Sequence, residues 1–566
     1  MVNLIIDKKQ ITCDENLTIL ECARQNGINI PSLCYLKDLN EIGACRICCV
    51  EVEGSDRLLA ACHTKVEEGM VVTTNSKRVL QNIRMNLQLI LSEHDSNCTS
   101  CTRNGNCTLQ KLAMKYNIFD QQFERKLPVN KPSFLPLVKT NSKCIKCLRC
   151  IQVCEKVQGI GIWDLIGTGS HARVAVKPGM SLAKNCALCG QCITHCPVGA
   201  LSERDDTNKV LAALDNEKKV TVVQIAPAVR SAWAEELGLP DNSATEKRMV
   251  AAIKALGFDY VFDTNFTADL TIMEEGNELI ERIKNGGTMP MFTSCCPGWV
   301  RFLKSEYPEF APNLSTAKSP QQMFGAVAKS YFAKKIGVEP KRIFCVSIMP
   351  CVAKKEEAAL PNMNDACGDP DVDVVLTTRE LSRMLKSSYI DIEKLEEAEF
   401  DSPLGSSTGA AVIFGVTGGV LEAALRTAYF VLTGQAPSPY QFTMVRGIKG
   451  RRVAELDING IKLRVAVTSG LGNARALIED IKSGREHYDF VEIMSCPGGC
   501  VGGGGQPIHD GEENAEARSK KLYEIDEKRE LRCSHENPEV QTMYEEYFGK
   551  PLSELSHNLL HTEHLV

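Results

Sequence analysis

Short runs of apolar residues open the chain and predict a small β-rich domain over residues 1–78. VNLIIDKKQIT predicts a hairpin, LTILECARQNGI a short helix and ICCVEVEG a strand. Helical spacing follows in RVLQNIRMNLQLILSEHD, and a cysteine-rich loop then runs to about residue 125. A polar, proline-containing stretch over about 126–140 predicts a linker, and residues 141–205 hold two similar cysteine-rich units.

From about residue 210 the pattern changes to β-type runs that alternate with helices. VTVVQIAPAVR predicts a strand leading into a helix, and KRIFCVSIMPC and DVDVVLTTREL repeat the alternation. This predicts a large α/β domain with mostly parallel strands and its active groups at the strand ends. We therefore expect a multidomain α/β and α+β protein with domains over 1–78, 79–126, 137–208 and 209–566.

The amino-acid composition is ordinary except for an excess of cysteine. The chain has 566 residues, 43% hydrophobic and 24% charged, which is typical of a core-forming protein. The net charge is −6 and no basic block is present, so we expect no nucleic-acid partner. With no export pattern and no membrane-spanning apolar run, we expect a cytoplasmic protein without a membrane partner. The 26 cysteines lie mostly in short-spaced groups, where thiolates can bind metal.

Two ligand groups precede the linker. The first supplies the four thiolates that a [2Fe–2S] cluster needs: Cys34, Cys45, Cys48 and Cys62. Cys49 is the alternative to Cys48, although adjacent strand residues point to opposite sides. The second adds an imidazole to three thiolates, as a [4Fe–4S] cluster requires: His94, Cys98, Cys101 and Cys107. A zinc site has the same ligand count and is the alternative for this group.

The two cysteine-rich units share the spacing of bacterial ferredoxins that hold two [4Fe–4S] clusters. They are KCIKCLRCIQVCE, in which Glu155 replaces the usual proline, and NCALCGQCITHCP. In that fold the fourth cysteine of each run binds the other cluster. One set is then Cys144, Cys147, Cys150 and Cys196. The other is Cys186, Cys189, Cys192 and Cys154. Four clusters in one chain serve to move single electrons.

Three further segments end in Cys–Pro–Gly-rich turns: FTSCCPGWVRF (292–302), SIMPCVAKKEEA (347–358) and EIMSCPGGCVGGGGQP (492–507). Each begins as a β-type run, so we expect all three to meet at one end of the sheet. Glycines 502–505 allow close backbone approach and unusual φ and ψ, as expected beside a bulky inorganic cofactor. A zinc site would need neither these glycines nor a twinned cysteine.

These segments resemble the three signatures of [FeFe]-hydrogenases, and the resemblance extends over essentially the whole chain. It is greatest to the monomeric clostridial type with four accessory clusters. It implies a β-grasp [2Fe–2S] ferredoxin-like domain, a [4Fe–4S] domain with one His and three Cys ligands, a two-[4Fe–4S] ferredoxin domain and an α/β H-cluster domain. The implied enzyme is an oxidoreductase that interconverts protons and H2, with ferredoxin or flavodoxin as redox partner and maturation proteins that build part of its cofactor.

The resemblance implies an H-cluster, a [4Fe–4S] cubane joined through one cysteine sulfur to a diiron subsite with CO, CN⁻ and azadithiolate. The implied cubane ligands are Cys296, Cys351, Cys496 and Cys500, with Cys500 the shared sulfur. Lys354 is expected to donate to a cyanide, and Glu357 to pair with that lysine. The implied pocket wall is Pro227, Gln321, Met349, Phe414 and Met494, whose apolar members are plain core on the sequence alone.

Cys295 precedes the implied ligand Cys296 in the sequence. The resemblance implies that Cys295 is the first proton relay. The alternative is a buried thiol without a role. Glu275, Glu278 and Arg282 share one helix face, and with Ser315 they match the family's proton path. Alone, those carboxylates would predict a solvated face.

The sequence departs from the family at Ala228, where relatives often carry serine, and at Ser495, where alanine is commoner. No role is expected for Cys13, Cys22, Cys49, Cys345, Cys367 and Cys533. Three other classes fit only part of the chain: a respiratory NADH dehydrogenase large subunit, an iron–sulfur assembly factor and a hydrogen sensor.

Overall fold

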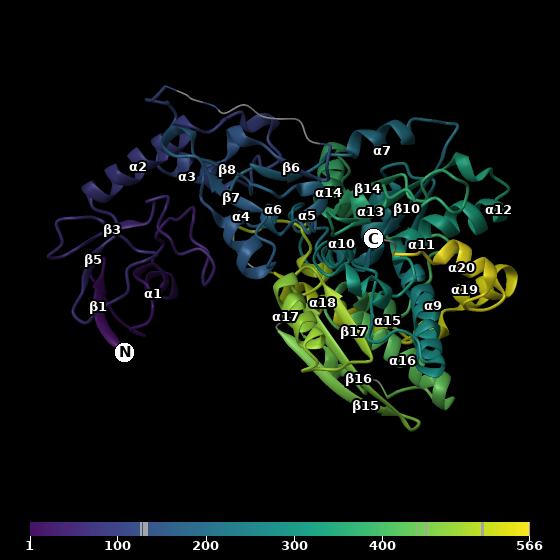
Figure 1. Ribbon diagram of the computed structural model, residues 1–566. Helices are drawn as coiled ribbons and strands as arrows, with labels where there is room; N and C mark the ends of the chain where they lie inside the picture. Colours follow the sequence, from purple (N-terminus) through teal and green to yellow (C-terminus); the bar gives the residue numbers. More distant parts are fainter. Residues whose placement is uncertain (125–126, 128–133, 439, 448–449, 511–513, 565–566) are drawn as a thin grey trace. The chain divides into compact units, whose positions relative to one another are not determined.

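The computed structural model describes residues 1–124, 127, 134–438, 440–447, 450–510 and 514–564 (Figure 1). Part of the expected linker over 126–140 therefore lies outside the described residues. The chain forms two compact units. The first unit comprises Met1–Lys156, Gly161–Met180 and His195–Ser202. The second unit comprises Val157–Ile160, Ser181–Thr194 and Glu203–Val566.

The first unit begins with a mixed five-stranded sheet in the order β2-β1-β5-β3-β4. Its strands are β1 (Val2–Ile6), β2 (Lys9–Cys13), β3 (Cys49–Val52), β4 (Leu59–Ala60) and β5 (Val71–Thr73). The predicted hairpin is confirmed, because β1 pairs with β2 in antiparallel register. The predicted short helix is α1 (Ile19–Gln25), which Thr18 and Glu21 start with a capping box. Alternate residues of β1 are buried, as the pattern predicted.

The rest of the first unit consists of short elements around cysteine-rich loops. The predicted long helix is α2 (Lys77–Ser92), whose buried residues Val79, Ile83 and Leu87 follow helical spacing. The other elements are α3 (Thr108–Lys115), β6 (Leu137–Lys139), α4 (Arg149–Gln152), β7 (Trp163–Ile166) and β8 (Arg173–Val176); β9 (Leu201–Glu203) ends at the boundary between the units.

The second unit is built on two four-stranded sheets. One is entirely parallel, in the order β11-β10-β13-β14, and contains β10 (Val220–Ile225), β11 (Tyr260–Asp263), β13 (Ile343–Met349) and β14 (Val374–Thr377). The other, in the order β12-β17-β16-β15, contains β12 (Met291–Phe292), β15 (Arg451–Ile458), β16 (Ile461–Ser469) and β17 (Phe490–Met494). Only β15 runs antiparallel to its neighbour among these eight strands. The predicted mixed α/β architecture with mostly parallel strands is confirmed.

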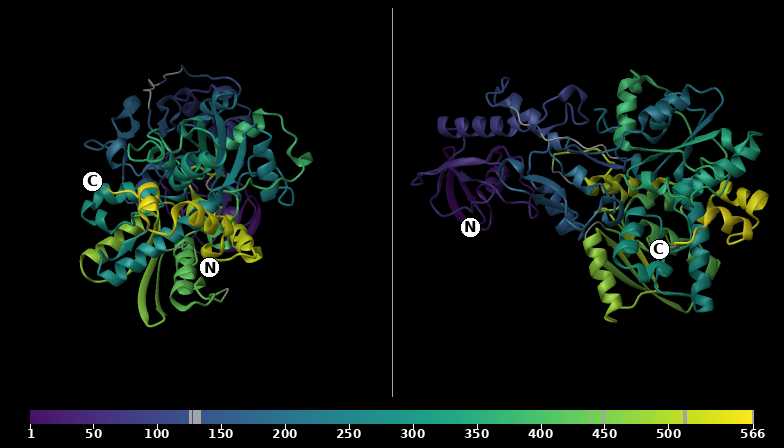
Figure 2. Two further views of the ribbon diagram at one scale, coloured as in Figure 1. Left: turned by 90° about the vertical axis from the view of Figure 1, so that its right-hand side faces the viewer. Right: turned by 45° about the horizontal axis from the view of Figure 1, so that its top comes forward.

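Helices surround these sheets, and the long α9 (Thr264–Asn285) packs against α16 (Gly419–Thr433) (Figures 1 and 2). The other α-helices of this unit are α5 (Leu182–Asn185), α6 (Gln191–Thr194), α7 (Thr207–Leu214), α8 (Glu246–Lys254), α10 (Pro297–Glu306), α11 (Pro320–Val327), α12 (Ala333–Lys335), α13 (Lys354–Glu357), α14 (Thr378–Ser387), α15 (Gly409–Val412), α17 (Leu471–Lys482), α18 (Ala515–Lys528), α19 (Pro538–Met543) and α20 (Glu554–Leu560).

One local expectation was met only in part and another was wrong. The run VTVVQIAPAVR leads into a helix, but this is a 3-10 helix of three residues, Pro227–Val229. Just beyond it, Ser231 Oγ donates to the carbonyl of Ala228 at 2.8 Å. The three cysteine segments also do not follow strands of one sheet, because β13 belongs to one sheet and β12 and β17 to the other. Each run is equally apolar, so the sequence could not tell which strands pair.

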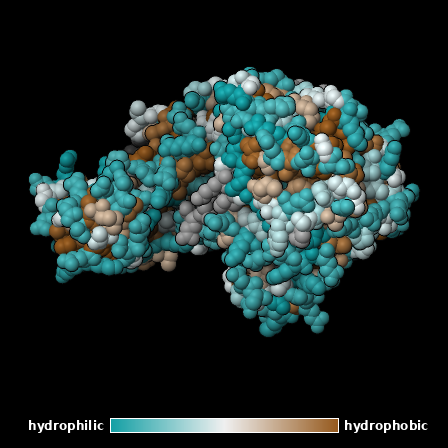
Figure 3. Space-filling model, turned by 90° about the horizontal axis from the view of Figure 1, so that it is seen from below, coloured by the Kyte–Doolittle hydropathy of each residue, from teal (hydrophilic) through white to brown (hydrophobic). Residues whose placement is uncertain are grey.

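No described helix is long and apolar enough to cross a membrane. The face shown in Figure 3 is largely hydrophilic, with apolar residues scattered over it.

Candidate active site

The catalytic candidates follow the carboxyl ends of three strands in the second unit. Cys295 and Cys296 lie between β12 and α10, Cys351 follows β13, and Cys496 follows β17. Cys500 begins a 3-10 turn shortly after Cys496. Strand ends are where parallel α/β sheets place their ligands, so the site lies where this architecture predicts it.

The four implied cubane thiols face one another. Burial raises the pKa of Cys496 far above its ordinary value, and the nearby charges of Cys351, Cys296 and Cys500 raise it further. The pKa of Cys351 is raised to about 12 by burial and then by Cys296. Buried thiolates this close together need neighbouring positive charge, which cluster iron supplies. The donor set therefore fits an iron–sulfur cluster.

The spacing of these thiols also bears on the kind of metal. Sulfurs around one zinc ion lie about 3.8 Å apart, given Zn–S bonds of about 2.3 Å. Among the described residues, only Cys533, His535 and Glu536 bring three such ligand atoms within 4.8 Å of one another. The four thiols are thus spread more widely than a single ion allows, as a polynuclear cluster requires.

Ser495 contacts one of these thiols directly. Its Oγ lies 3.3 Å from Cys296 Sγ, and its backbone N–H donates to the same sulfur at 3.4 Å. Hydrogen bonds to cluster sulfurs help to set the reduction potential. The departure from alanine at this position therefore has a physical consequence that the sequence did not reveal.

The glycine run packs backbone against backbone. A Cβ at Gly504 would lie 2.2 Å from the carbonyl oxygen of Cys189, and one at Gly503 would lie 2.1 Å from that of Pro350. The expected close approach is thus present, toward neighbouring loops. The expected unusual φ is not: the positive values belong to Gly498 and Gly499, and none occurs over 502–505.

Lys354 is held in a buried ion pair. Its Nζ lies 2.9 Å from Glu357 Oε2 and donates to the carbonyl of Cys295 at 3.0 Å. Burial opposes its charge, but the Glu357 carboxylate outweighs burial and raises the pKa of Lys354. Gln321 and Ser319 also donate to Glu357 Oε2, at 3.0 and 2.9 Å. The ammonium is therefore fixed beside the cysteine turn.

The proton-path candidates form a partial hydrogen-bond chain along α9. Ser315 Oγ donates to Glu278 Oε2 at 2.7 Å, and Arg282 Nη2 donates to Glu278 Oε1 at 2.6 Å. The Arg282 side chain is 14% exposed and that of Glu278 is 11% exposed. This end of the chain therefore approaches solvent.

Glu275, one turn before Glu278 on α9, stands apart from this hydrogen-bond chain. It is 1% exposed, and neither carboxylate oxygen has a hydrogen-bond partner among the described residues. Burial, and then the charge of Glu278, raise the pKa of Glu275 to about 8. Burial and the charge of Glu275 likewise raise the pKa of Cys295. Both groups are therefore protonated at neutral pH, and Glu275 is close enough to Cys295 to raise its pKa.

The remaining pocket candidates are buried. Phe414 and Met494 belong to one apolar cluster, against which Cys295, Cys296 and Cys500 pack. Met349 ends β13, and Pro227 begins the 3-10 turn after β10.

Some residues near the site were missed by sequence reasoning. Ser319 holds Glu357, Glu492 carries a pKa raised to about 7 by burial, and His564 Nε2 lies 2.9 Å from the carbonyl oxygen of Ser315. Glu492 also influences the charge states of Glu275 and Cys500. Of these three residues, only Glu492 had a signal in the sequence, because it lies four residues before Cys496.

In the first unit, the thiols of the expected [2Fe–2S] site contact one another. Cys34 accepts hydrogen bonds from Cys45 and Cys62, which lower its pKa, and Cys62 also bonds to Cys48. The pKa of Cys49 is raised by burial and then by the charge of Cys48. The contacts thus join Cys48 to the other three thiols.

The expected [4Fe–4S] sites of this unit are cavities lined by thiols. Cys144, Cys147 and Cys150 line one cavity together with Cys196, more than 40 residues further along the chain. His94, Cys98 and Cys107 line a second, and a Cβ at Gly199 would meet Cys101 Sγ at 2.6 Å.

His94 Nδ1 lies 3.0 Å from the carbonyl oxygen of Lys143. A proton on Nδ1 puts the lone pair on Nε2, the atom that would bind iron. No three ligand atoms of this His94 group lie within 4.8 Å of one another, which disfavours one zinc ion there.

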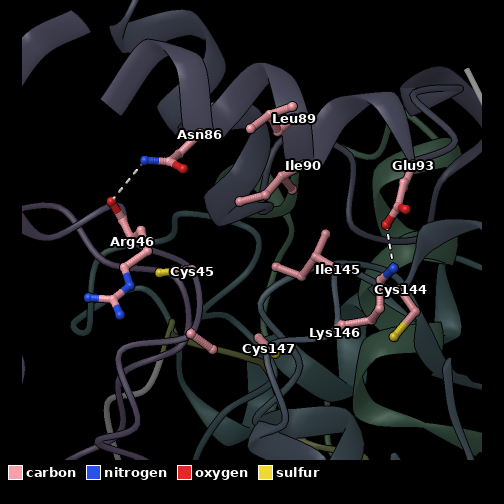
Figure 4. A pocket seen from close by; sticks show the side chains of 11 residues that line it. Cys45, Arg46, Asn86, Leu89, Ile90, Glu93, Cys144, Ile145, Lys146 and Cys147 are labelled. Atoms are coloured by element: carbon pink, nitrogen blue, oxygen red, sulfur yellow. Dashed lines mark hydrogen bonds and ion pairs between the residues drawn. The ribbon is translucent and has the colours of Figure 1, made fainter. Parts of the chain in front are cut away.

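A further pocket lies between two of these thiol sets (Figure 4). Cys45 lines one part of it and Cys144 and Cys147 another. Lys146 pairs with Glu93 at its rim, as the dashed line marks. The last predicted set divides between the units, with Cys154 in the first and Cys186, Cys189 and Cys192 in the second, and stays a prediction.

Mostly parallel sheets with a widely spaced four-thiol set at their strand ends, preceded by ferredoxin-like thiol sites, are typical of an iron–sulfur oxidoreductase. Comparison with family models agrees. Residues 219–504 match the iron only hydrogenase large subunit, C-terminal domain, and 512–565 match the iron hydrogenase small subunit. Residues 1–77 match a 2Fe-2S iron-sulfur cluster binding domain. Residues 84–122 and 136–202 match the NADH-ubiquinone oxidoreductase-G iron-sulfur binding region and the NADH-quinone oxidoreductase subunit 3 ferredoxin-like domain.

Relatives match over the full chain. The NADP-reducing hydrogenase subunit HndD of Solidesulfovibrio fructosivorans is 46% identical over 100% of this chain and 99% of the relative. Iron hydrogenase 1 of Clostridium pasteurianum is 41% identical over 99% of each. A solved structure of apo [FeFe]-hydrogenase HydA1 from Chlamydomonas reinhardtii has a TM-score of 0.57 at 43% identity, covering 63% of this chain and 98% of that one.

The chain therefore belongs to the iron-only, or [FeFe], hydrogenase family, and it is of the clostridial type with accessory iron–sulfur domains. It is an oxidoreductase that reduces protons to H2. The match over 219–504 excludes a respiratory NADH dehydrogenase large subunit. Cytosolic iron-sulfur assembly component 3 of Mus musculus matches less well, at 30% identity over 74% of the chain.

Proposed function

We propose that Cys296, Cys351, Cys496 and Cys500 hold the cubane of the H-cluster, with Cys500 also bonded to the diiron subsite. The observation that carries this assignment is a set of four thiols gathered at the strand ends. The charges of neighbouring thiols in the set raise the pKa of Cys351, Cys496 and Cys500, yet the set is spread too widely for one ion. When bound, the cluster supplies the metal chemistry that joins two protons and two electrons into H2. The chain's own residues then supply and position the protons.

Protons would reach the site through Arg282, Glu278, Ser315, Glu275 and Cys295. The outer half of this path is supported by hydrogen bonds of 2.6 and 2.7 Å on Glu278. The inner half is supported by the charge of Glu275, which together with burial raises the pKa of Cys295. Because both inner groups are neutral at pH 7, each can give up a proton and be reloaded from the outer end.

Lys354 would act by position. Its ammonium is fixed by Glu357, and Gln321 and Ser319 fix that carboxylate in turn. A held ammonium can donate to a cyanide without moving. Pro227, Met349, Phe414 and Met494 would form the pocket wall, keeping water from the diiron subsite.

Electrons would pass through one [2Fe–2S] and three [4Fe–4S] clusters, held by the thiols and the histidine named above. Reduced ferredoxin or flavodoxin is the proposed donor to a monomeric enzyme whose diiron subsite is built by maturation proteins. The name of the relative HndD makes it a subunit of an NADP-reducing hydrogenase, so partner subunits are the second candidate donor. A cytoplasmic location stays a prediction.

One assay distinguishes the two candidate electron donors. Reduced ferredoxin added to the purified chain should support H2 evolution at a rate similar to that with a small-molecule donor. If evolution needs NADPH and added partner subunits, and ferredoxin fails, the partner-subunit alternative holds.

The proton path is tested by Cys295→Ala. Without the thiol we expect H2 evolution from reduced methyl viologen to fall at least about 100-fold, since a positioned proton donor contributes about 10²- to 10⁴-fold. The cubane signal in electron paramagnetic resonance should persist. Cys345→Ala, which removes a buried thiol from β13, is the matched control and should keep its activity. Full activity in Cys295→Ala would remove the relay assignment.

A further inference from the structure

Two thiols outside every predicted ligand set touch in the first unit. Cys13 ends β2 and Cys22 lies in α1, and their sulfurs are 2.9 Å apart. Cys13 is 5% exposed and Cys22 is 0% exposed, within the apolar core of the five-stranded sheet. The sequence indicates no role for either cysteine, because nine positions separate them and no spacing motif joins them.

The distance between these sulfurs is unusual for two thiols that merely share a core. Uncharged heavy atoms normally touch at about 3.5 Å or more. A disulfide bond is about 2.05 Å long, so the sulfurs need to move less than about 1 Å to bond. The hairpin register and the helix cap fix both backbones, so this proximity is built into the fold.

We propose that Cys13 and Cys22 form a dithiol–disulfide pair that a peroxide oxidises. Cys13 is the more accessible of the two, so its sulfur would meet the oxidant first. One hydrogen peroxide converts the Cys13 thiol to a sulfenic acid and releases one water. The Cys22 sulfur then attacks the Cys13 sulfur, forming the S–S bond and releasing a second water. Both thiol protons leave in water, and the peroxide accepts the two electrons.

The chemistry of Cys22 keeps the pair reduced until an oxidant arrives. Burial, and then contact with Cys13, raise the pKa of Cys22 to about 12. A thiol of such a pKa is almost entirely protonated at neutral pH and exchanges poorly with other disulfides. A sulfenic acid formed 2.9 Å away changes this, because its sulfur is electrophilic and already in contact.

The bond would fasten α1 beside the expected [2Fe–2S] loop. Backbone N–H groups of Ile19 and Leu20 donate to the carbonyls of Thr64 and Ala61, each at 2.9 Å. Those carbonyls flank Cys62, an expected ligand. Oxidation at Cys22 would therefore tie the hairpin to the helix that supports this loop.

Peptide mapping of the full-length protein tests the proposal. The anaerobic protein receives a stoichiometric dose of hydrogen peroxide, is denatured with an alkylating agent present, and is digested. We expect a peptide pair joined through Cys13 and Cys22, lighter by two hydrogen atoms than the two free peptides, in most molecules. In Cys13→Ser and Cys22→Ser the pair should vanish. Cys345, a buried thiol of β13, should be recovered alkylated throughout.

Two results would overturn the proposal. One is recovery of both Cys13 and Cys22 as alkylated thiols at a dose that oxidises the more accessible Cys367. The other is a link from Cys13 or Cys22 to a different cysteine, which would indicate exchange after cluster loss. Neither readout depends on hydrogenase activity, so failure here leaves the proposed function untouched.

Discussion

At the scale of single residues, Glu275 makes the stability of the protein depend on pH. Its carboxyl is buried, and its pKa is raised to about 8, mainly by burial. Between its ordinary value near 4.5 and about 8, the folded protein holds a proton that the unfolded chain releases. Stability must therefore fall as pH rises through that window, by up to about 1.4 kcal/mol per pH unit.

Glu275→Gln should remove this dependence and block the proton path. As pH rises from about 5 to 8, the thermal unfolding midpoint of the variant should rise relative to that of the wild type. H2 evolution should fall about 10²- to 10⁴-fold. Thermal scans over this pH range and a viologen assay measure both. Glu281→Gln, on the exposed face of α9, is the control; the same pH profile for both variants would contradict the account.

Ser495 tunes the cubane in this account. Its hydroxyl lies 3.3 Å from Cys296 Sγ, and a hydrogen bond of about 1 kcal/mol corresponds to about 40 mV for one electron. Ser495→Ala should lower the cubane potential by about that amount in a redox titration followed by electron paramagnetic resonance. Ser382→Ala removes a buried hydroxyl in α14 that bonds to Thr378 and should leave the potential unchanged. A rise in Ser495→Ala would refute the hydrogen-bond explanation.

At the scale of elements, Asn40 joins two cluster loops of the first unit. Its buried Nδ2 donates to the carbonyl of Cys34 at 2.6 Å and to that of Cys147 at 2.9 Å. Arg149 also donates to the carbonyl of Tyr35, and Lys156 to that of Leu39. The loop of the expected [2Fe–2S] site is thus pinned to the ferredoxin-like segment.

Asn40→Ala should loosen this junction by about 2–3 kcal/mol, because two buried carbonyls lose their donor. Backbone amides around Cys34 and Cys147 should then exchange hydrogen about 30- to 150-fold faster, which mass spectrometry of exchanged peptides measures. The control is Asn86→Ala, which removes an exposed donor to Arg46 at 3.3 Å. Equal exchange in both variants would show that Asn40 does not hold the loops.

The sequence predicted the helices and strands better than it predicted which strands pair with one another. Periodicity located the hairpin, α1 and α2, because each buries one face at a regular spacing. The helix α9 was also predicted, although its first half is buried on all sides. The assignment of β12 and β13 to different sheets had no local signal, since both are short apolar runs. The pattern after β10 predicted a helix, but not that it would be a 3-10 helix of three residues.

The candidate site was also predicted only in part. Short cysteine spacings indicated which thiols come together, and the ferredoxin pattern predicted that Cys196 joins a run of cysteines more than 40 residues earlier. The contacts of Asn40 and Ser495 span more than 100 residues along the chain, and no motif records them. Contacts made by residues such as Asn40 and Ser495, which follow no spacing motif, can be found only from the three-dimensional structure.

At the scale of the whole molecule, the order of the thiol sites matches hydrogenases end to end. HndD and iron hydrogenase 1 align over 99% or more of this chain. The proposed [2Fe–2S] set and two of the proposed [4Fe–4S] sets lie in the first unit, and the proposed four-thiol set at the strand ends lies in the second. Electron carriers and a proton path would thus be joined in one chain, with about twenty iron atoms when every proposed cluster is present.

The most direct test of that account is H2 evolution from reduced methyl viologen, measured anaerobically on protein supplied with the diiron cofactor and with its iron content determined. We predict rapid evolution that carbon monoxide stops. No evolution from protein that contains all accessory clusters and the diiron subsite would contradict the account and favour an electron-transfer or sensing role.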